Sequence, residues 1–177
     1  LTSAVNTFAN QIAADANAKK INHRVAVVGF ASGSRYDVDY DNTEVFIGRN
    51  QYKYGTNAKN QYAKALQDMS TAAGVANVNA SISALDAYGG TMTDLGIEMA
   101  NGIFDANPIA EGSERKRVVV VFTDGEPGWS GYDSTVASNA VTQASTAKNK
   151  YGATVYTVGI FQGANVNGSD NVNTFMR

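Results

Sequence analysis

The sequence predicts an α/β fold in which a doubly wound, mostly parallel open sheet carries helices on both faces. Three short apolar runs are typical of buried strands, at residues 25–30, 118–122 and 154–161. Segments with the three- and four-residue spacing of amphipathic helices lie between these runs. Because strands that alternate with helices pair in parallel through right-handed crossovers, this order predicts one open sheet.

The predicted helices follow from the spacing of their apolar residues. The first is marked by Leu1, Ala4, Val5, Phe8 and Ile12. The second is marked by Met92, Leu95, Met99 and Ile103, and either Thr91 or Thr93 is available as its N-terminal cap. The third is marked by Val136, Ala140, Val141, Ala144 and Ala147, and we expect Gly152 to end it.

Residues 35–88 depart from this alternation. We expect strand-like segments at 36–40 and 43–47, a tyrosine-rich polar passage at 51–62, and short helices at 63–69 and 75–85. The tyrosines form either a recognition surface or the packing of this region. We interpret residues 35–88 as an elaboration of one sheet edge within a single domain that spans residues 1–177.

Composition excludes several classes of function. The chain has 177 residues, one histidine and no cysteine, so disulfides, thiolate zinc sites and cysteine nucleophiles are excluded. Any metal site must therefore use oxygen ligands. The net charge of −2 and the lack of a concentrated basic patch argue against nucleic-acid binding. No stretch approaches the roughly 20 consecutive apolar residues of a membrane span.

Two polar motifs fall where open α/β sheets bind ligands, at the carboxyl ends of the strands. Asp124 directly follows a predicted strand, and Thr91 lies in a glycine turn that opens a predicted helix. A carboxylate and hydroxyls on neighbouring loops form a set of hard oxygen ligands suited to Mg²⁺. Each residue also has a plain structural explanation, because Asp-Gly is a common turn and Thr91 can cap the helix.

With these motifs the chain resembles the von Willebrand factor A family. The resemblance is carried by residues 25–30, 89–93, 119–126 and 154–160. It implies a Rossmann-like, doubly wound sheet with a metal-ion-dependent adhesion site. In such a site, Mg²⁺ or another hard cation such as Mn²⁺ or Ca²⁺ keeps one open position for a carboxylate of a protein ligand. By position, Thr91 and Asp124 correspond to the metal-loop threonine and aspartate.

The family's first metal loop, Asp-x-Ser-x-Ser, is missing from this sequence. In the family it follows the central first strand and precedes the first helix, and the chain opens inside what resembles that helix. We therefore expect strand and loop upstream of Leu1, in the same protein or in a second polypeptide. Without them the sheet would have a gap with unpaired backbone groups. Residues 30–34 have the two serines but phenylalanine in place of aspartate, and no helix follows, so we assign them no such role.

Acidic and aromatic residues surround the expected site. Glu126 is expected at its rim rather than among the metal ligands. Trp129 either contacts a ligand at the rim or anchors the loop as a buried side chain. We interpret Asp94 as an acid in the first helical turn, where it favours the helix dipole, rather than as a ligand.

The sequence favours a binding module over an enzyme. The leading hypothesis is a metal-dependent adhesion domain that binds an acidic group of a host or extracellular-matrix protein. The insertion and the Thr-Asp-Gly-Glu-Pro motif resemble Gram-positive bacterial surface and pilus adhesins, which implies an extracellular, cell-wall-anchored location. One alternative is a metal-dependent α/β hydrolase or phosphoryl-transfer enzyme that uses Asp124, although a paired general base and a phosphate loop are lacking. Another is an intracellular scaffold subunit of the same family.

Overall fold

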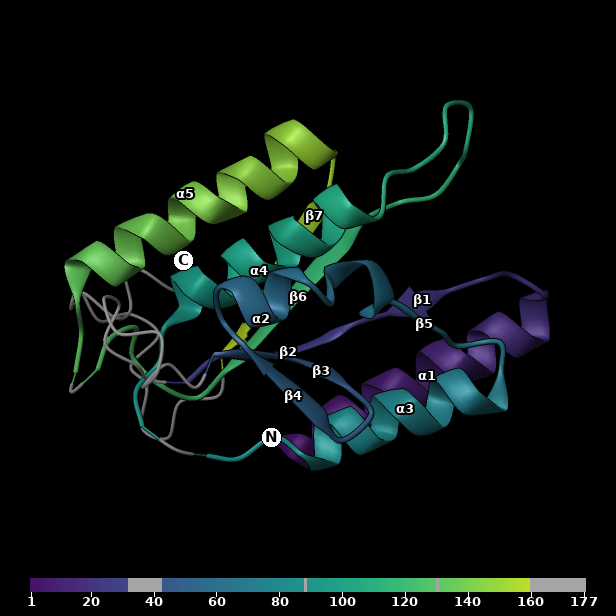
Figure 1. The fold of residues 1–177 in the computed structure, drawn as a ribbon, viewed down its shortest axis with the longest axis horizontal. Helices are drawn as coiled ribbons and strands as arrows, with labels where there is room; N and C mark the ends of the chain where they lie inside the picture. Colours follow the sequence, from purple (N-terminus) through teal and green to yellow (C-terminus); the bar gives the residue numbers. More distant parts are fainter. Residues whose placement is uncertain (32–42, 88, 130, 160–177) are drawn as a thin grey trace.

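The computed structural model describes residues 1–31, 43–87, 89–129 and 131–159 (Figure 1). Its helices are α1 (Thr2–Lys19), α2 (Thr56–Lys59), α3 (Ala72–Ser83), α4 (Thr93–Ala106) and α5 (Ser134–Tyr151), with a 3₁₀ turn, η1, at Tyr62–Lys64. Its strands are β1 (Arg24–Val25), β2 (Val27–Gly29), β3 (Glu44–Ile47), β4 (Asn50–Lys53), β5 (Gln67–Asp68), β6 (Val118–Thr123) and β7 (Thr154–Gly159). The predicted strand at 36–40, the serines at 32 and 34, and residues 160–161 lie outside the described residues.

The described strands form three separate ladders rather than one mostly parallel sheet. β6 and β7 pair in parallel, as predicted, from Val118 opposite Thr154 to Thr123 opposite Gly159. β1 instead pairs antiparallel with β5, and β2 pairs antiparallel with β3. The expectation of a central parallel strand at residues 25–30 is therefore not met among the described strands, because this segment pairs with strands of the 43–69 region.

Helices nevertheless cover both faces of the β1–β2 segment (Figure 1). Val25 and Val27 pack towards α1 and α3, in a cluster that contains Ala16, Val78 and Ile82. Ala26 and Val28 pack on the other side, in a cluster that contains Met99 and Ile103 of α4. The alternation of these four side chains follows from the two-residue period of a strand.

One face of β6 is buried and the other is only partly covered, which corrects the expectation that both faces are buried. Val119 and Val121 are 9% and 6% exposed and pack against α4 and α5. Val118, on the other face, is 50% exposed, and on the neighbouring β7 Tyr156 is 57% exposed. Helices α4 and α5 thus cover only one face of β6, even though the strand carries apolar residues on both faces.

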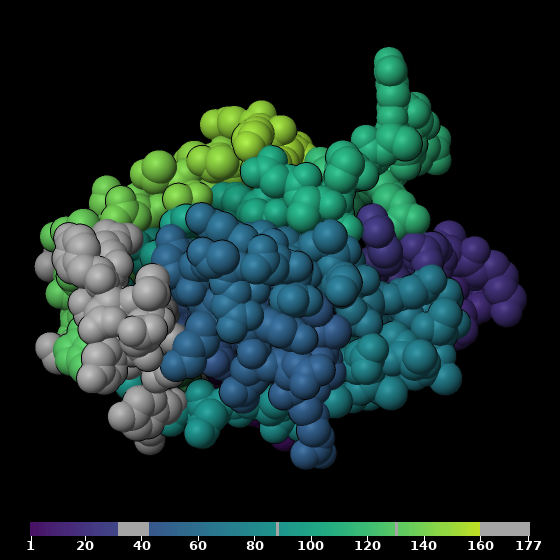
Figure 2. Space-filling view, in the orientation of Figure 1, coloured from purple at the N-terminus to yellow at the C-terminus, as the bar shows by residue number. Residues whose placement is uncertain are grey.

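The region from β3 to β5 packs against α4 and does not leave its tyrosines free. β3 and β4 form a hairpin whose two-residue turn begins at Gly48, with φ 60°. Tyr62 is 7% exposed, and burial, with a smaller contribution from Glu98, raises its pKa to about 12. Tyr54 donates a hydrogen bond to Glu98 Oε1 (2.9 Å). Packing and hydrogen bonding to α4 therefore explain both tyrosines, and the blue region that contains β3 and β4 covers the centre of the face shown in Figure 2.

Two of the local predictions for the elaborated region are confirmed and one is wrong. The strand predicted at 43–47 and the helix predicted at 75–85 are present as β3 and α3. The polar passage at 51–62 contributes to β4, and the helix predicted at 63–69 is only the short η1 turn followed by β5. The reason is tertiary pairing: β5 joins β1, and the amide of Met69 donates to the carbonyl of His23 (2.8 Å).

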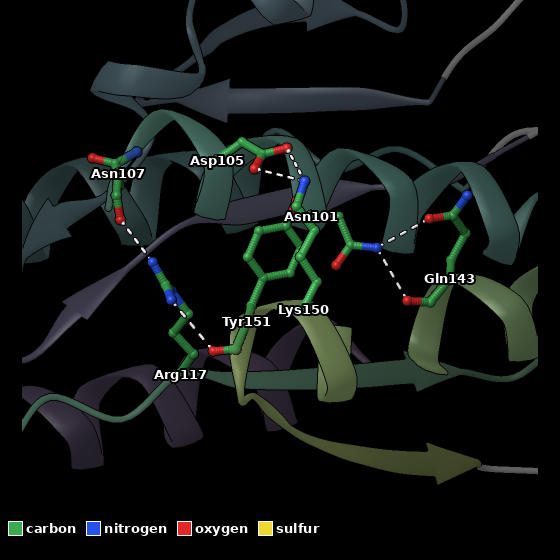
Figure 3. Close-up of polar contacts among 7 residues, drawn as sticks. All are labelled: Asn101, Asp105, Asn107, Arg117, Gln143, Lys150 and Tyr151. Atoms are coloured by element: carbon green, nitrogen blue, oxygen red, sulfur yellow. Dashed lines mark hydrogen bonds and ion pairs between the residues drawn. The ribbon is translucent and has the colours of Figure 1, made fainter. Parts of the chain in front are cut away.

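A polar cluster ties the end of α4 to the end of α5, next to the start of β6 (Figure 3). Arg117 Nη1 donates to the carbonyl oxygen of Tyr151 (3.3 Å), and Arg117 Nη2 donates to that of Asn107 (3.2 Å). The guanidinium also lies 5.4 Å and 5.7 Å from the ring centroids of Phe104 and Tyr151. One side chain therefore satisfies carbonyl groups at two helix C-termini, which the helices cannot satisfy themselves.

Among the described residues, no helix has both the length and the apolar character needed to cross a membrane.

α5, one of the two longest helices described, carries Lys148 and Lys150 in its last turn. It ends at Gly152 in the left-handed conformation, φ 63°, as the sequence predicts. Its start is capped by Asp133, whose carboxylate accepts from the amides of Thr135 (2.7 Å) and Val136 (3.3 Å).

Candidate metal centre

Three loops meet at the carboxyl ends of β2 and β6. The amide of Met92 donates to the carbonyl oxygen of Ala31, which follows β2 (3.2 Å). Thr91 forms a two-way backbone bridge with Gly128, in which the Thr91 amide donates at 2.7 Å and the Gly128 amide at 3.0 Å. The loop before α4 is thus joined by backbone hydrogen bonds to the segments that follow both strands.

The close approach of these loops requires glycine at two positions. A Cβ atom on Gly90 would lie 2.5 Å from the carbonyl oxygen of Gly128 and 2.7 Å from the Cα of Trp129. A Cβ atom on Gly125 would lie 2.6 Å from the hydroxyl oxygen of Thr91. The glycine turn was recognisable in the sequence, but these steric roles were not, because they depend on contacts between loops distant in the chain.

The loops that carry Asp124 and Thr91 lie against each other in this arrangement. Asp124 is exposed, directly after β6, and the next residue, Gly125, faces the Thr91 hydroxyl. The turn after the strand is held by Thr123, which is 4% exposed and whose hydroxyl accepts from the Gly125 amide (3.3 Å) and donates to the Gly125 carbonyl (3.2 Å). The structure therefore brings together the two loops that carry Thr91 and Asp124, and both residues line the same cavity.

Thr91 does not cap α4, which corrects one of the two expectations for this residue. The N-cap position is Met92, and among the described residues no side chain caps this helix. Thr93 is the first residue of the helix and is 4% exposed. The backbone bonds of Met92 to Ala31 and of Thr91 to Gly128 fix the start of the helix in place of a side-chain cap.

The oxygen donors fit a hard divalent cation, and they are few. Within the described part of the chain, no group of three or more histidine, cysteine, aspartate or glutamate side chains is placed to hold a metal. Thr91 and Asp124 offer a hydroxyl and a carboxylate, which suit Mg²⁺, an ion that takes few protein ligands and keeps several waters. The two residues could therefore supply part of an octahedral shell, and water or another segment would supply the rest.

The rim of this edge is acidic and aromatic. Glu126 is exposed, and Trp129 is 62% exposed, so Trp129 is not a buried anchor of its loop. A shallow pocket of about 400 Å³ lies beside it, lined by Trp129, Gly131, Tyr132, Asp133 and Ser134. The backbone of the loop is closed by a hydrogen bond from the Asp133 amide to the Pro127 carbonyl (2.7 Å). The tryptophan therefore projects from a well-braced loop.

Asp94 lies in the first turn of α4, as predicted, and it is 1% exposed. Its burial was not foreseen, and neither was that of Asn101, which is 5% exposed on the same helix. Asn101 Nδ2 donates to both the carbonyl and the side-chain oxygen of Gln143, each at 3.0 Å (Figure 3). The two polar residues are seven positions apart, a spacing that places them on one face of the helix and could have indicated a buried polar stripe.

A large cavity adjoins the candidate metal centre. It has a volume of about 1,680 Å³ and reaches from α1 to the β1–β2 segment on one side and β6 on the other. Gly89, Gly90, Thr91 and Asp124 belong to its lining. The cavity and the loop edge therefore form one continuous region of the surface.

Comparison with known proteins identifies the family. No match was found among curated proteins or among solved structures. The family model of the von Willebrand factor type A domain matches residues 2–176, nearly the whole chain. This protein chain belongs to the von Willebrand factor type A domain family.

Proposed function

We propose that this domain is a metal-dependent protein-binding module in which a hard divalent cation, Mg²⁺ in the first instance, is held at Thr91 and Asp124. Von Willebrand factor type A domains are in general protein-interaction modules rather than enzymes, and they often bind a divalent metal. When bound, the cation supplies an electrophilic position that accepts a carboxylate oxygen of the protein ligand.

The observation that carries this proposal is the position of the Thr91 hydroxyl beside Gly125, one residue from Asp124. The Thr91 backbone is held on both sides by its bridge to Gly128, so its hydroxyl needs little reorganisation to act as a ligand. Asp124 is exposed and provides the negative charge, either directly or through a coordinated water. An exposed carboxylate beside a pre-positioned hydroxyl favours cation binding, and it does so without leaving an unpaired charge buried in the protein.

Further ligands are expected from a segment outside residues 1–177. The residues described contribute one carboxylate and one hydroxyl, and Mg²⁺ prefers six oxygen ligands in octahedral geometry. The resemblance to the family assigns the remaining protein ligands to an Asp-x-Ser-x-Ser loop that follows a strand. We propose that another segment of the same protein carries this loop to the edge formed by Thr91 and Asp124.

Glu126 and Trp129 are proposed to contact the ligand at the rim. Exposed tryptophan on a braced loop is the kind of side chain that dominates binding energy in interfaces, because it buries a large area at a small entropic cost. Glu126 is placed to favour basic groups that flank the carboxylate of the ligand. The ligand would then present an acidic residue with apolar and basic neighbours.

The biological setting is proposed to be the surface of a Gram-positive bacterium, with the domain in a cell-wall-anchored surface or pilus protein. The support is the Thr-Asp-Gly-Glu-Pro motif, the elaboration between β2 and α3, and the cysteine-free composition. The partner would be a host or extracellular-matrix protein. A domain displayed on the cell surface could reach an acidic side chain of such a protein and bind it at Thr91 and Asp124.

A binding assay on immobilised fibronectin and collagen tests this function. The native polypeptide that contains residues 1–177 is compared with Asp124→Ala, with Mg²⁺ and with EDTA. Binding is expected in Mg²⁺ only, and Asp124→Ala is expected to abolish it. Glu111→Ala, which removes an exposed acid outside the candidate site, is the control and should bind normally. Binding that persists in EDTA or in Asp124→Ala would refute the metal-dependent function.

A further inference from the structure

The segment between α4 and β6 projects from the body of the molecule in Figure 1, and Figure 2 shows it as a separate protrusion. We propose that this segment is a site of proteolytic processing, at which an endopeptidase specific for basic residues hydrolyses the peptide bond between Arg115 and Lys116. The cut leaves the domain folded as two associated polypeptides. This inference goes beyond the proposed function and does not depend on metal binding.

The local sequence keeps this segment out of regular structure. Pro108 follows Asn107, the C-terminal cap of α4, and a proline there cannot continue the helix. Gly112 has φ 76° and open space around it. The amide of Ser113 donates to the carbonyl three residues earlier (3.1 Å), which forms a turn within the segment. Residues 108–116 therefore contain neither helix nor strand.

The segment is accessible, and its backbone is weakly held. Residues 108–116 are all exposed except Ile109, which is half-buried. Apart from the turn, these residues form no backbone-to-backbone hydrogen bond within the described part of the chain. Exposed segments of this kind are preferred sites of proteolytic nicking, because a protease binds its substrate as an extended chain. This segment can adopt that shape without the unfolding of a helix or a strand.

Two exposed basic residues, Arg115 and Lys116, lie at the end of the segment. An endopeptidase of the proposed class takes an arginine or lysine side chain into a pocket that carries a carboxylate. The guanidinium of Arg115 donates to Asn22 Oδ1 (2.9 Å), and its amide donates to Ser113 Oγ (3.3 Å). Hydrogen bonds at the surface contribute little net free energy, so Arg115 can leave these partners for the pocket.

Arg117, the third basic residue of this run, is protected from cleavage. Its carbonyl oxygen accepts from the amide of Thr154 at the start of the β6–β7 ladder (2.9 Å). Its guanidinium donates to carbonyl groups at the ends of α4 and α5. The bond after Arg117 is therefore held in the sheet, and the bond after Lys116 lies directly beside it. The bond after Arg115 has exposed residues on both sides, which makes it the preferred site.

Cleavage breaks the bond between the carbonyl carbon of Arg115 and the nitrogen of Lys116. Water supplies a hydroxyl group to the carbon and a proton to the nitrogen, and a further proton passes from the new carboxyl group to the new amine. Thr91 then lies on the first polypeptide and Asp124 on the second. Processing therefore places the two candidate metal ligands on different polypeptides.

Contacts that cross the cut hold the two products together. Ile97 of α4 packs in a buried cluster with residues of β6 and α5. Thr91 and Gly128 are joined by their two-way backbone bridge. Lys150 of α5 pairs with Asp105 of α4 (Nζ to Oδ1, 3.0 Å). Hydrolysis of one bond in the projecting segment removes none of these contacts, so the nicked domain stays assembled.

Limited digestion with trypsin tests this inference. The native polypeptide that contains residues 1–177 is treated with a low concentration of trypsin in EDTA, and the new termini are identified by mass spectrometry and N-terminal sequencing. Two other exposed basic residues, Lys20 and Arg49, serve as internal comparisons. The amides of Lys20 and Ile21 both donate to the carbonyl of Ala16, and Arg49 lies in the two-residue turn between β3 and β4. Neither site can become extended without the loss of this local structure.

Among the described residues, cleavage is expected first after Arg115, at least about tenfold faster than after Lys20 or Arg49. Arg115→Gln is expected to remove this cut. The matched control, Lys116→Gln, should change its rate by less than about twofold. The nicked protein is expected to elute as one species in size-exclusion chromatography and to separate into two polypeptides only in denaturant.

Equal rates of cleavage after Arg115, Lys20 and Arg49 would overturn the proposal, because the projecting segment would then be no more accessible than a helix end or a tight turn. Cleavage of this segment at the wild-type rate in Arg115→Gln would overturn the assignment of the bond. Separation of the two products without denaturant would overturn the assembled state. Because the digestion is carried out in EDTA, failure of the proposed metal function would leave these results unchanged.

Discussion

The hydroxyl oxygen of Thr91 lies 2.6 Å from the point where a Cβ atom on Gly125 would stand. No side chain fits at residue 125 without moving that hydroxyl. Gly125 directly follows Asp124, so the absence of a side chain at residue 125 lets the Thr91 hydroxyl approach the turn that carries Asp124, just after β6 ends at Thr123. The candidate metal centre therefore depends on a residue that has no side chain.

Replacing Gly125 with alanine is expected to weaken Mg²⁺ binding more than it weakens the fold. The new methyl group collides with the end of a side chain, so Thr91 can rotate away, but its hydroxyl then leaves the site. We expect a loss of about tenfold in Mg²⁺ affinity, equivalent to about 1.4 kcal/mol, with a small change in melting temperature. In a Thr91→Ala background, Gly125→Ala should cost little further affinity. Calorimetric titration and melting curves check both, and an unchanged affinity in Gly125→Ala would contradict the assignment of Thr91.

Gly90→Ala is expected to destabilise the domain, because its methyl group meets backbone atoms of Gly128 and Trp129. Neither can rotate away, so overpacking of about 1–3 kcal/mol is expected in the free energy of unfolding, together with weaker Mg²⁺ binding. Gly112→Ala is the control: it has φ 76° and open space around it, so it should cost strain but leave Mg²⁺ binding intact. Denaturant titration measures the stability. A Gly90→Ala variant that folds and binds as the wild type does would contradict the close approach of the two loops.

Arg117 is expected to contribute to stability through its two carbonyl bonds (Figure 3). Arg117→Lys keeps the charge but loses the planar fork, and we expect a loss of about 1–2 kcal/mol in the free energy of unfolding, with a larger loss in Arg117→Ala. The neighbouring Lys116 is exposed, and Lys116→Ala should change stability by less than about 0.5 kcal/mol. Equal stabilities of the Arg117 and Lys116 variants would show that the contacts in Figure 3 do not stabilise the fold.

Tyr62 is expected to govern part of the alkaline unfolding of the domain. Burial raises its pKa from the ordinary 10.0 to about 12, so the folded state favours the neutral phenol. The stability from this preference is complete below pH 10 and is lost as the pH rises from 10 through about 12. Tyr62→Phe keeps the ring and removes the titration, so its melting temperature should fall less steeply over that range. Parallel slopes for the variant and the wild type would contradict the burial of the hydroxyl.

The elements that could be predicted from the sequence are those whose signals are local. α5 has an apolar stripe and a glycine that can adopt φ 63° at its end, and both signals lie within the helix or next to it. β6 and β7 are apolar runs separated by one helix, which is enough to predict a parallel pair. That the loops carrying Thr91 and Asp124 lie together could be predicted from the rule that ligand loops gather at the carboxyl ends of strands.

The elements that the sequence misassigned are those that long-range contacts decide. Residues 63–69 have helical character locally, yet β5 forms there because it pairs with β1, more than forty residues away. β4 forms at the start of the polar passage, for which no strand was predicted, because the turn at Gly48 brings it against β3. The steric requirement for glycine at positions 90 and 125 could likewise not be predicted from the sequence, since each depends on an atom in another loop.

The central claim, that Thr91 and Asp124 hold a divalent cation, is tested most directly by a calorimetric Mg²⁺ titration of the native polypeptide that contains residues 1–177. The wild type is compared with Asp124→Asn and with Glu126→Gln, a matched loss of one acidic charge two residues away. Asp124→Asn is expected to lower the Mg²⁺ affinity by about tenfold or more, whereas Glu126→Gln should change it by less than about twofold. Equal Mg²⁺ affinity in the wild type and Asp124→Asn would contradict the claim.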